Sequence, residues 1–365
     1  MLQARKILTL LLMLCLLASV AACTTGQTGG QSQATEATDP SAEAPTEPAG
    51  QESSQPLVVV DAAGREVTVP ENIERIVITC RGGTTNEVAI FADPNMIFGQ
   101  PTQKAYPQLL KMFPYFETVT DPGSFDDVSV EQVLALQPDI VFVGVSSKKG
   151  NALLEEAGLV TYTMQIGWAT AETLKEEFLN MGKILKNEEL AEKLVAYWDE
   201  KINLVKELVA AVPEEQRKVV YYTSKTITDA NVGNWGQSWI KTSGGKPVIE
   251  GQFNGDISVE QVMEWNPDVI LTHAGSGIDA IMSDERIQDL QAVKDKAVYQ
   301  APTGAFWWDR PSPESPLSFL WLAKTLYPEA TAEIDLKAET VEFFKIFYGY
   351  DLSDAEYESF FATGK

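Results

Sequence analysis

A single histidine, His273, occurs among the 365 residues of the chain. A transition-metal site built directly on imidazole ligands would need more than one histidine. A serine–histidine–carboxylate centre could use only His273 as its base. The sequence also lacks the Gly-x-Ser-x-Gly elbow of hydrolases and the paired histidines of metalloproteases. It therefore offers no positive support for an enzyme, or for a metal held directly by side chains.

Basic residues are also scarce, since 28 Lys and Arg stand against 52 Asp and Glu, which gives a net charge of -24 and a pI of about 4.4. Nucleic-acid binding needs a basic footprint, so we expect no nucleic-acid partner. Solubility is sufficient reason for the negative charge. The three cysteines are Cys15, Cys23 and Cys80. The first two lie in the N-terminal segment, so we expect no disulfide framework.

The first residues have the pattern of a targeting segment. Arg5 and Lys6 form a basic region, Ile7–Leu17 is apolar, and small residues then lead to Cys23. This pattern predicts a signal peptide over residues 1–22. The small residues before Cys23 resemble a bacterial lipobox, which implies cleavage before Cys23 and lipidation of its thiol. An ordinary secretory signal with an incidental cysteine is the alternative.

Residues 23–55 are rich in small and polar side chains and contain no aromatic residue. Such a segment does not bury enough apolar surface to order itself. We expect a disordered tether that holds the folded body away from a membrane. The expected location is therefore extracytoplasmic, with a lipid anchor in the bacterial cell membrane.

The folded part is organised around a repeat. Asp127–Asp139 (DVSVEQVLALQPD) returns 129 residues later as Asp256–Asp268 (DISVEQVMEWNPD), with eight of the thirteen positions identical. Each copy reads as a short helix that ends before a proline, followed by an apolar run typical of a buried strand. A repeat at so long a period indicates two domains of one construction rather than a solenoid. Ser-x-x-Gln capping boxes are predicted at Ser129 and Gln132 and at Ser258 and Gln261.

A long helix is predicted between the two copies. Asn187 precedes a stretch with apolar residues at helical spacing, and Pro213 ends it. A helix of roughly 25 residues spans about 40 Å, so we interpret residues 187–213 as a rigid connector. A helix within one lobe is the alternative. The predicted fold is α/β, with two related lobes at 56–186 and 214–365, the second ending in helices, and a ligand cleft between them.

Four markers in this order resemble the substrate-binding lipoproteins of ABC importers for iron complexes and vitamin B12. They are the hairpin Asp61–Pro70, the run Glu131–Asp139, the midchain helix, and Trp308–Pro313 followed by Leu320–Ala323. The resemblance covers roughly Pro56 to Tyr348. It implies two lobes joined by one long helix, a ligand in the cleft, and delivery of that ligand to a permease dimer with its ATPase. It further implies a monomer without catalytic activity or a cofactor of its own.

Candidate ligand-binding residues follow from the rule that open α/β sheets bind ligands beyond the carboxyl ends of their strands. Aromatic faces suit conjugated ligands, and arginine suits carboxylates and other planar oxyanions. Similarity to the vitamin B12 binders of the family also places aromatics at Phe125 and Trp307. Structural alternatives are that Arg310 pairs with Asp309 and that one of Trp307 and Trp308 belongs to the core. The candidates are Arg81, Thr84, Tyr106, Phe125, Ser146 and Lys148 in the first lobe, and Trp235, His273, Trp307, Trp308 and Arg310 in the second.

With one histidine in the chain, a metal is expected to arrive inside a chelate. Cationic residues at the cleft of so acidic a chain favour an anionic ligand, and a ferric siderophore is the leading hypothesis. Haem and a corrinoid are close alternatives, and the aromatics argue against a bare oxyanion such as molybdate. Two alternatives come from other classes: a secreted lipoprotein hydrolase that uses His273, and a structural surface lipoprotein without a ligand.

Glu131 and Glu260 occupy the same position in the two copies of the repeat, the second helical residue after the capping serine. A carboxylate at this position is stabilised by the helix N-terminus and needs no buried partner. The resemblance implies that glutamates at this position dock on arginines of the permease. Stabilisation of the two helices alone is the alternative.

Overall fold

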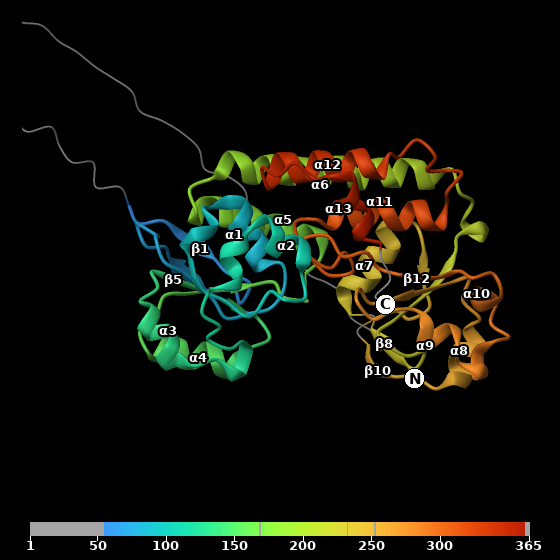
Figure 1. Cartoon of the computed structure of the whole chain (residues 1–365), viewed down its shortest axis with the longest axis horizontal. Helices are drawn as coiled ribbons and strands as arrows, with labels where there is room; N and C mark the ends of the chain where they lie inside the picture. Colours follow the sequence, from blue (N-terminus) through green and yellow to red (C-terminus); the bar gives the residue numbers. More distant parts are fainter. Residues whose placement is uncertain (1–54, 168, 232, 252, 362–365) are drawn as a thin grey trace, which may run out of the picture. The chain divides into compact units, whose positions relative to one another are not determined.

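The computed structural model describes residues 55–361 with the exception of residues 168, 232 and 252, and these belong to one compact unit, Ser54–Lys365 (Figure 1). The predicted signal peptide, the predicted tether up to residue 54 and the predicted lipidation site Cys23 lie outside the described residues. Within the described part, no helix combines the length and the apolar character that crossing a membrane requires.

The N-terminal lobe contains a parallel sheet. A β1–β2 hairpin comes first, and four described strands then form a sheet in the order β4-β3-β5-β6, with parallel pairing throughout. All five residues of β5 are buried, as expected for a strand covered on both faces. The elements are β1 (Val58–Val60), β2 (Glu66–Thr68), β3 (Ile76–Ile78), α1 (Thr84–Phe91), η1 (Pro94–Met96), β4 (Ile97–Gly99), α2 (Pro107–Met112), η2 (Pro114–Glu117), η3 (Phe125–Asp127), α3 (Val130–Leu136), β5 (Ile140–Gly144), α4 (Lys148–Glu156) and β6 (Thr161–Met164).

The C-terminal lobe repeats this plan with a mixed sheet. Its described strands run in the order β10-β8-β7-β11-β12, with β9 also paired to β7. The pairs β7–β11, β11–β12 and β7–β9 are parallel. The elements are β7 (Val219–Thr223), β8 (Asp229–Asn231), α7 (Asn234–Thr242), β9 (Lys246–Pro247), β10 (Asn254–Asp256), α8 (Val259–Trp265), β11 (Val269–Thr272), α9 (Asp279–Met282), η5 (Glu285–Ile287), α10 (Gln291–Lys294), β12 (Val298–Gln300), α11 (Ser315–Leu326), α12 (Leu336–Phe347) and α13 (Asp354–Ser359).

The two copies of the repeat fold alike, as α3–β5 and α8–β11. Ser129 and Ser258 each accept a hydrogen bond from the backbone N–H three residues on, at 3.4 and 3.1 Å. Both helices end on a left-handed residue, Gln137 (φ 50°) and Asn266 (φ 39°), directly before the proline. The prediction of full capping boxes is wrong in one respect, because only the serine half of each box forms. The side chain of Gln261 instead donates to Glu264 at 3.2 Å.

The predicted long helix is present as α6 (Glu188–Ala210), which follows α5 (Ala171–Ile184) and precedes η4 (Glu214–Gln216). It packs against α5 on the N-terminal side and against α11 on the C-terminal side, and α12 runs beside it (Figure 1). Trp198 is fully buried on α6 and meets Phe178 of α5 and Phe319 of α11, with ring centroids 5.4 and 5.9 Å apart. One helix therefore contributes to the core on both sides.

The first of the C-terminal helices, α11, begins at Ser315 and has Pro316 in its first turn, where proline is favoured. Ser312 and Pro313 lie in the turn before it, where the carbonyl of Pro313 accepts a hydrogen bond from the Trp198 indole at 3.1 Å.

A buried carboxyl group ties the C-terminal helices to the N-terminal lobe. Oε2 of Glu314 accepts hydrogen bonds from the Trp308 indole (3.0 Å) and the backbone N–H of Ala305 (3.2 Å), and Oε1 accepts one from the Tyr348 hydroxyl (2.9 Å). The same hydroxyl accepts a bond of 3.0 Å from Asn86 on α1. Burial raises the pKa of Glu314 to about 7, and the three hydrogen bonds only partly oppose this shift.

We expect this group to make stability depend on pH. The folded-state pKa of Glu314 lies above its ordinary value, so its contribution is complete below about pH 4.5 and is lost as the pH rises through 7. The contribution to the free energy of unfolding should fall by up to about 3 kcal/mol across this window. Urea unfolding at several pH values between about 5 and 8 should show a shallower decline in Glu314→Gln than in the natural chain. The exposed control Glu329→Gln should keep the natural slope, and equal slopes in all three proteins would contradict the assignment.

Candidate functional site

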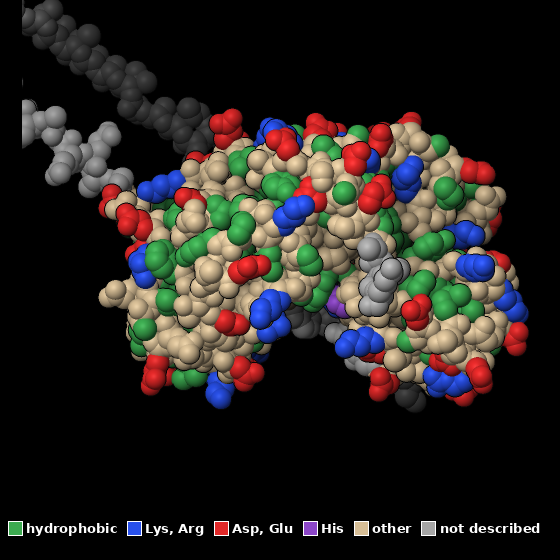
Figure 2. Space-filling model, viewed as in Figure 1, with side chains coloured by type: hydrophobic (Ala, Val, Ile, Leu, Met, Phe, Trp, Pro, Cys, Tyr) green, Lys and Arg blue, Asp and Glu red, His purple; other side chains and the backbone are tan. Residues whose placement is uncertain are grey.

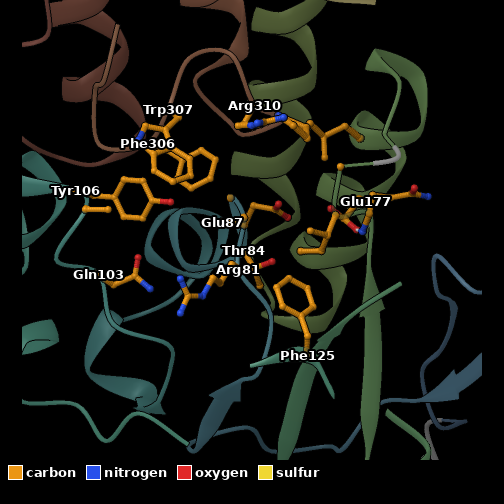
Figure 3. Close-up of a pocket in the computed structure, with 18 of the residues that line it drawn as sticks. Arg81, Thr84, Glu87, Gln103, Tyr106, Phe125, Glu177, Phe306, Trp307 and Arg310 are labelled. Atoms are coloured by element: carbon orange, nitrogen blue, oxygen red, sulfur yellow. The ribbon is translucent and has the colours of Figure 1, made fainter. Parts of the chain in front are cut away.

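A cavity of about 290 Å³ lies between the two lobes, and Figure 2 shows the surface hollowed there. Its walls come from α1, η3, α5 and the loops after β3, β4 and β6 on one side, and from the loop before α11 on the other. Six of the eleven predicted residues line it (Figure 3), and they are Arg81, Thr84, Tyr106, Phe125, Trp307 and Arg310.

Two arginines enter the cavity from opposite lobes (Figure 3). Arg81 follows β3, and its Nε lies 3.4 Å from Oγ of Ser124. Among the described residues, no carboxylate lies within ion-pair distance of Arg81. Arg310 donates to Oδ1 of Asn231 at 3.3 Å, and its Nε lies 4.0 Å from Asp309. The pairing of Arg310 with Asp309 is thus at the limit of an ion pair, and its guanidinium remains available to the cavity.

Aromatic rings from both lobes close one end of the cavity. Tyr106 of the N-terminal lobe lies with its ring centroid 4.9 Å from Phe306 and 5.0 Å from Trp307 of the C-terminal lobe. Phe125 lines the other side from a left-handed backbone position (φ 54°). The carbonyl of Phe125 comes so close to Gly150 that a Cβ there would lie 2.2 Å from its oxygen. A glycine at position 150 thus lets α4 support the Phe125 turn.

His273 packs against Trp307 but does not line the cavity. The two ring centroids are 4.6 Å apart, and Nδ1 of His273 lies 2.5 Å from Oδ2 of the fully buried Asp309. Tyr222 donates to the same carboxylate oxygen. Burial opposes ionisation of Asp309, but the hydrogen bonds from His273 and Tyr222 and the charge of Arg310 outweigh it and hold the pKa below the ordinary value. This network orients the loop that carries Trp307 and Arg310.

Two of the predicted tryptophans belong to the core. Trp308 is fully buried and hydrogen-bonded to Glu314, and Trp235 is 3% exposed and packs against Trp198 and Phe319. Neither of them lines the cavity. Trp308 directly follows the cavity residue Trp307 and points to the opposite side of the loop. Of the pair Trp307 and Trp308, one was predicted as a possible core residue, and Trp308 is that residue.

Two further predicted residues lie at the surface. Ser146 and Lys148 are exposed and do not line the cavity. Helix α4 begins at Lys148, shortly after the end of β5, and directs these side chains away from the cleft. At the carboxyl end of β5, the residue that lines the cavity is therefore Phe125, which lies beside this strand end in space.

Sequence reasoning missed two carboxyl groups and a ring. Glu87 of α1 and Glu177 of α5 both line the cavity, as does Phe306. Glu87 and Glu177 lie on helices, so the rule that selects loops after strands does not reach them. A signal for Glu177 was present, since it shares the apolar face of its helix with the buried residues Leu174 and Phe178. A charged residue at a core position of an amphipathic helix calls for an explanation.

Glu131 and Glu260 are exposed in the first turns of α3 and α8. Figure 1 shows both helices on the side of the sheets away from α6 and α12. A surface groove runs beside Glu260, lined also by Met263 and Arg286. On α3 the exposed Leu134 lies one turn after Glu131. Among the described residues, no cluster of three or more His, Cys, Asp or Glu is placed to hold a metal ion.

Comparison with known proteins places this geometry in a family. A model of the periplasmic binding protein family matches residues 86–304. The molybdate-binding protein MolA of Haemophilus influenzae is 24% identical over 80% of this chain and 90% of its own length. The iron(3+)-hydroxamate-binding protein FhuD of Bacillus subtilis is 23% identical over 71% of this chain and 84% of its own length.

A solved structure shares the fold over most of its length. A periplasmic solute binding protein from Veillonella parvula superposes with a TM-score of 0.72 and 26% identity, covering 84% of this chain and 97% of that one. The two-lobed α/β fold predicted from the repeat is thereby confirmed. The chain belongs to the periplasmic binding protein family, and it is an extracytoplasmic solute-binding component of an ABC transporter, not an enzyme.

Proposed function

We propose that this protein captures a compact anionic metal chelate, of the ferric-siderophore class, and passes it to its permease. The observation that supports this most is the pair of guanidinium groups, Arg81 and Arg310, which face one cavity from opposite lobes. Arg81 has no carboxylate within ion-pair distance among the described residues, and Arg310 lies at the 4.0 Å limit from Asp309. Arginine binds carboxylates and other planar oxyanions through a fixed fork of donors. An anionic ligand held by both arginines would also hold the two lobes together.

The apolar walls favour a ligand with an organic surface. Tyr106, Phe306 and Trp307 present rings at one end of the cavity, and Phe125 presents one at the other. Rings of this kind contribute contact area to flat or conjugated ligands. The volume of about 290 Å³ lies at the lower end of the roughly 300–1,000 Å³ typical of ligand pockets. A compact chelate is therefore favoured over haem or a corrinoid, which need more space.

A bare oxyanion is the second candidate. Two arginines in a small cavity suit a tetrahedral oxyanion, and one of the relatives is named for binding molybdate. The four aromatic rings around the cavity are the feature that a bare oxyanion leaves unused. The choice between the two ligand classes therefore depends on whether the aromatic walls contribute to affinity.

The anchor and the docking surface complete the proposal. The predicted signal peptide and Cys23 support a lipid anchor, with residues 23–55 as its tether. The two lobes comprise residues 56–186 and 214–365, and residues 187–213 connect them. Glu131 and Glu260 are exposed, occupy equivalent positions in the repeat, and lie on helices that share one side of the molecule. A dimeric permease would offer matching surfaces to such a pair. We propose that these glutamates pair with permease arginines.

The ligand class can be tested with a panel. Purified protein should be titrated with ferric citrate, a ferric hydroxamate, molybdate, haem and cobalamin, while tryptophan fluorescence and the unfolding temperature are recorded. A compact ferric chelate should quench the fluorescence, because Trp307 lies in the cavity wall, and Trp307→Phe should reduce the quenching. Binding of molybdate alone would favour the second candidate. A panel without any quenching or thermal shift would contradict the proposed function.

The two arginines should each matter for an anionic ligand. Arg81→Ala or Arg310→Ala removes a charge-assisted hydrogen bond, and each should weaken binding by about 1.5–3 kcal/mol. The measurement is the dissociation constant by calorimetry, with Arg286→Ala as a control because that residue pairs with Asp284 away from the cavity. Unchanged affinity in both cavity variants would point to a neutral ligand.

The docking assignment predicts a separation of binding from uptake. Glu131→Arg combined with Glu260→Arg should leave ligand affinity intact and abolish uptake in cells that carry the partner transporter. If the glutamates only stabilise their helices, uptake should survive with a loss of about 0.3–1 kcal/mol per site. Glu192→Arg with Glu207→Arg is the matched control, since both residues are exposed on α6, on the opposite side. Near-normal uptake by the folded Glu131/Glu260 variant would refute docking.

A further inference from the structure

Two carboxyl groups lie in the wall of the cavity, and among the described residues no Lys or Arg forms an ion pair with either of them. Glu87 of α1 is 2% exposed and Glu177 of α5 is 5% exposed, and the two side chains are hydrogen-bonded to one another. Figure 3 shows them reaching toward each other from their two helices. Oε2 of Glu177 also accepts a bond of 2.6 Å from the backbone N–H of Gln165. A hydrogen bond between two carboxyl groups requires that at least one of them carries a proton.

The neighbours of the pair keep it protonated. No arginine or lysine of the described residues acts on Glu87 or Glu177, although Arg81 and Arg310 line the same cavity. Burial raises the pKa of Glu87 well above its ordinary value, with a further rise from the charge and hydrogen bond of Glu177. Burial likewise raises the pKa of Glu177 to about 8, against the opposing effect of the bond from Gln165. At neutral pH both groups are therefore mainly carboxylic acids.

The other titratable groups around the pair do not change its protonation near neutral pH. Burial raises the pKa of Cys80 to about 12 and raises the pKa of Tyr162 and Tyr348 further above their ordinary values. These three groups therefore stay neutral below about pH 9. The remaining titratable and charged groups near the pair are Tyr106, Arg81 and Arg310 on the cleft side, and Asp61, Glu176 and Lys183 on the outer side.

One oxygen of the pair lacks a hydrogen-bond donor. Oε2 of Glu87 is buried, and no donor among the described residues reaches it. A buried polar atom without a partner costs free energy unless a ligand or water supplies one. Because Glu87 lines the cavity, a ligand there can supply the partner. In the acid form of the pair, this end of the cavity offers O–H donors in addition to the two guanidinium groups.

The pair also has a route to solvent that does not pass through the cleft. Glu177 and Gln165 line a second cavity of about 340 Å³ on the outer side of the lobe, together with Asp61 and Tyr162. A ligand that covers the cleft therefore leaves Glu177 accessible to protons from the outer cavity. Proton exchange can accompany binding even after the cleft is filled.

We propose that Glu87 and Glu177 form a carboxylic-acid subsite that donates hydrogen bonds to the anionic ligand, so that binding is coupled to proton uptake. The inference rests on the proposed function, because it requires a ligand with negatively charged oxygens. Two carboxylic acids and two arginines leave the cavity with a net positive charge. Deprotonation of the pair places negative charge beside the anion and weakens its binding. Ligands with a cationic group would show the opposite dependence on pH.

Molybdate and ferric citrate are the first probes, followed by any other member of the panel that binds. Molybdate keeps its double negative charge over the range studied, so a change in affinity reports on the protein. With a pKa of about 8 for Glu177, binding should weaken by about tenfold between pH 6 and pH 9. Calorimetry in two buffers with different heats of ionisation should show net proton uptake on binding near pH 8.

The variants separate this role from simple packing. Glu177→Gln keeps an N–H donor and a similar shape, so it should bind molybdate at pH 6 within a few fold of the natural protein. Its pH dependence and proton uptake should shift, because Glu87 is then the remaining titrating group of the pair. Glu176→Gln makes the same substitution at an exposed position of α5 and should behave like the natural protein. Glu177→Leu removes the donor and should weaken binding at every pH. Equal pH profiles for the natural protein and Glu177→Gln would overturn the inference.

A measurement without ligand separates this inference from the proposed function. In a Glu314→Gln background, which removes the other buried acid with a raised pKa, infrared difference spectra should show a protonated carboxylic acid near pH 7 that disappears when Glu87→Gln and Glu177→Gln are added. If the panel binds but this band is absent, or affinity rises with pH, the acid subsite is refuted and the proposed function stands. If no member of the panel binds, the proposed function fails, and the inference fails with it.

Discussion

The burial of Trp198 is the contact on which the joining of the two lobes depends. This indole packs against a ring from each side, donates a hydrogen bond to the carbonyl of Pro313, and has no exposed surface. It anchors α6 between α5 and α11, so the long helix is part of both cores rather than a free strut. Relative movement of the lobes is therefore restrained at the back of the molecule, and the cavity lies on the other side of this joint.

The cavity shows what two similar lobes can build where they face each other. Each lobe supplies one arginine and some of the aromatic side chains. Tyr106 contacts Phe306 and Trp307 across the gap between the lobes. The two lobes together offer the ligand charged groups, aromatic surface and a complementary shape. The carboxyl pair comes from the N-terminal lobe alone. The site is therefore asymmetric, although the lobes that form it are related by a repeat.

Buried acidic groups recur through this acidic protein, and each has a different local solution. Asp309 stays ionised because His273, Tyr222 and Arg310 surround it. Glu314 receives three neutral donors, which leave its pKa near 7. Glu177 has another carboxyl group as its neighbour and a still higher pKa. Desolvation acts on all three, and the number and charge of the donors decide the outcome.

Local periodicity, capping residues and a repeat along the chain were enough to predict the α/β class, the two related lobes and the long helix, and four ordered markers carried the resemblance to the family. Arg81, Phe125, Trp307 and Arg310 could also be assigned to the cleft, since loops after parallel strands converge on one edge of a sheet. That Trp308 and Trp235 face the core, that Ser146 and Lys148 face solvent, and that Glu87 meets Glu177 became visible in the folded structure alone. Side-chain direction and contacts between helices far apart in the chain arise from packing, which local sequence patterns do not encode.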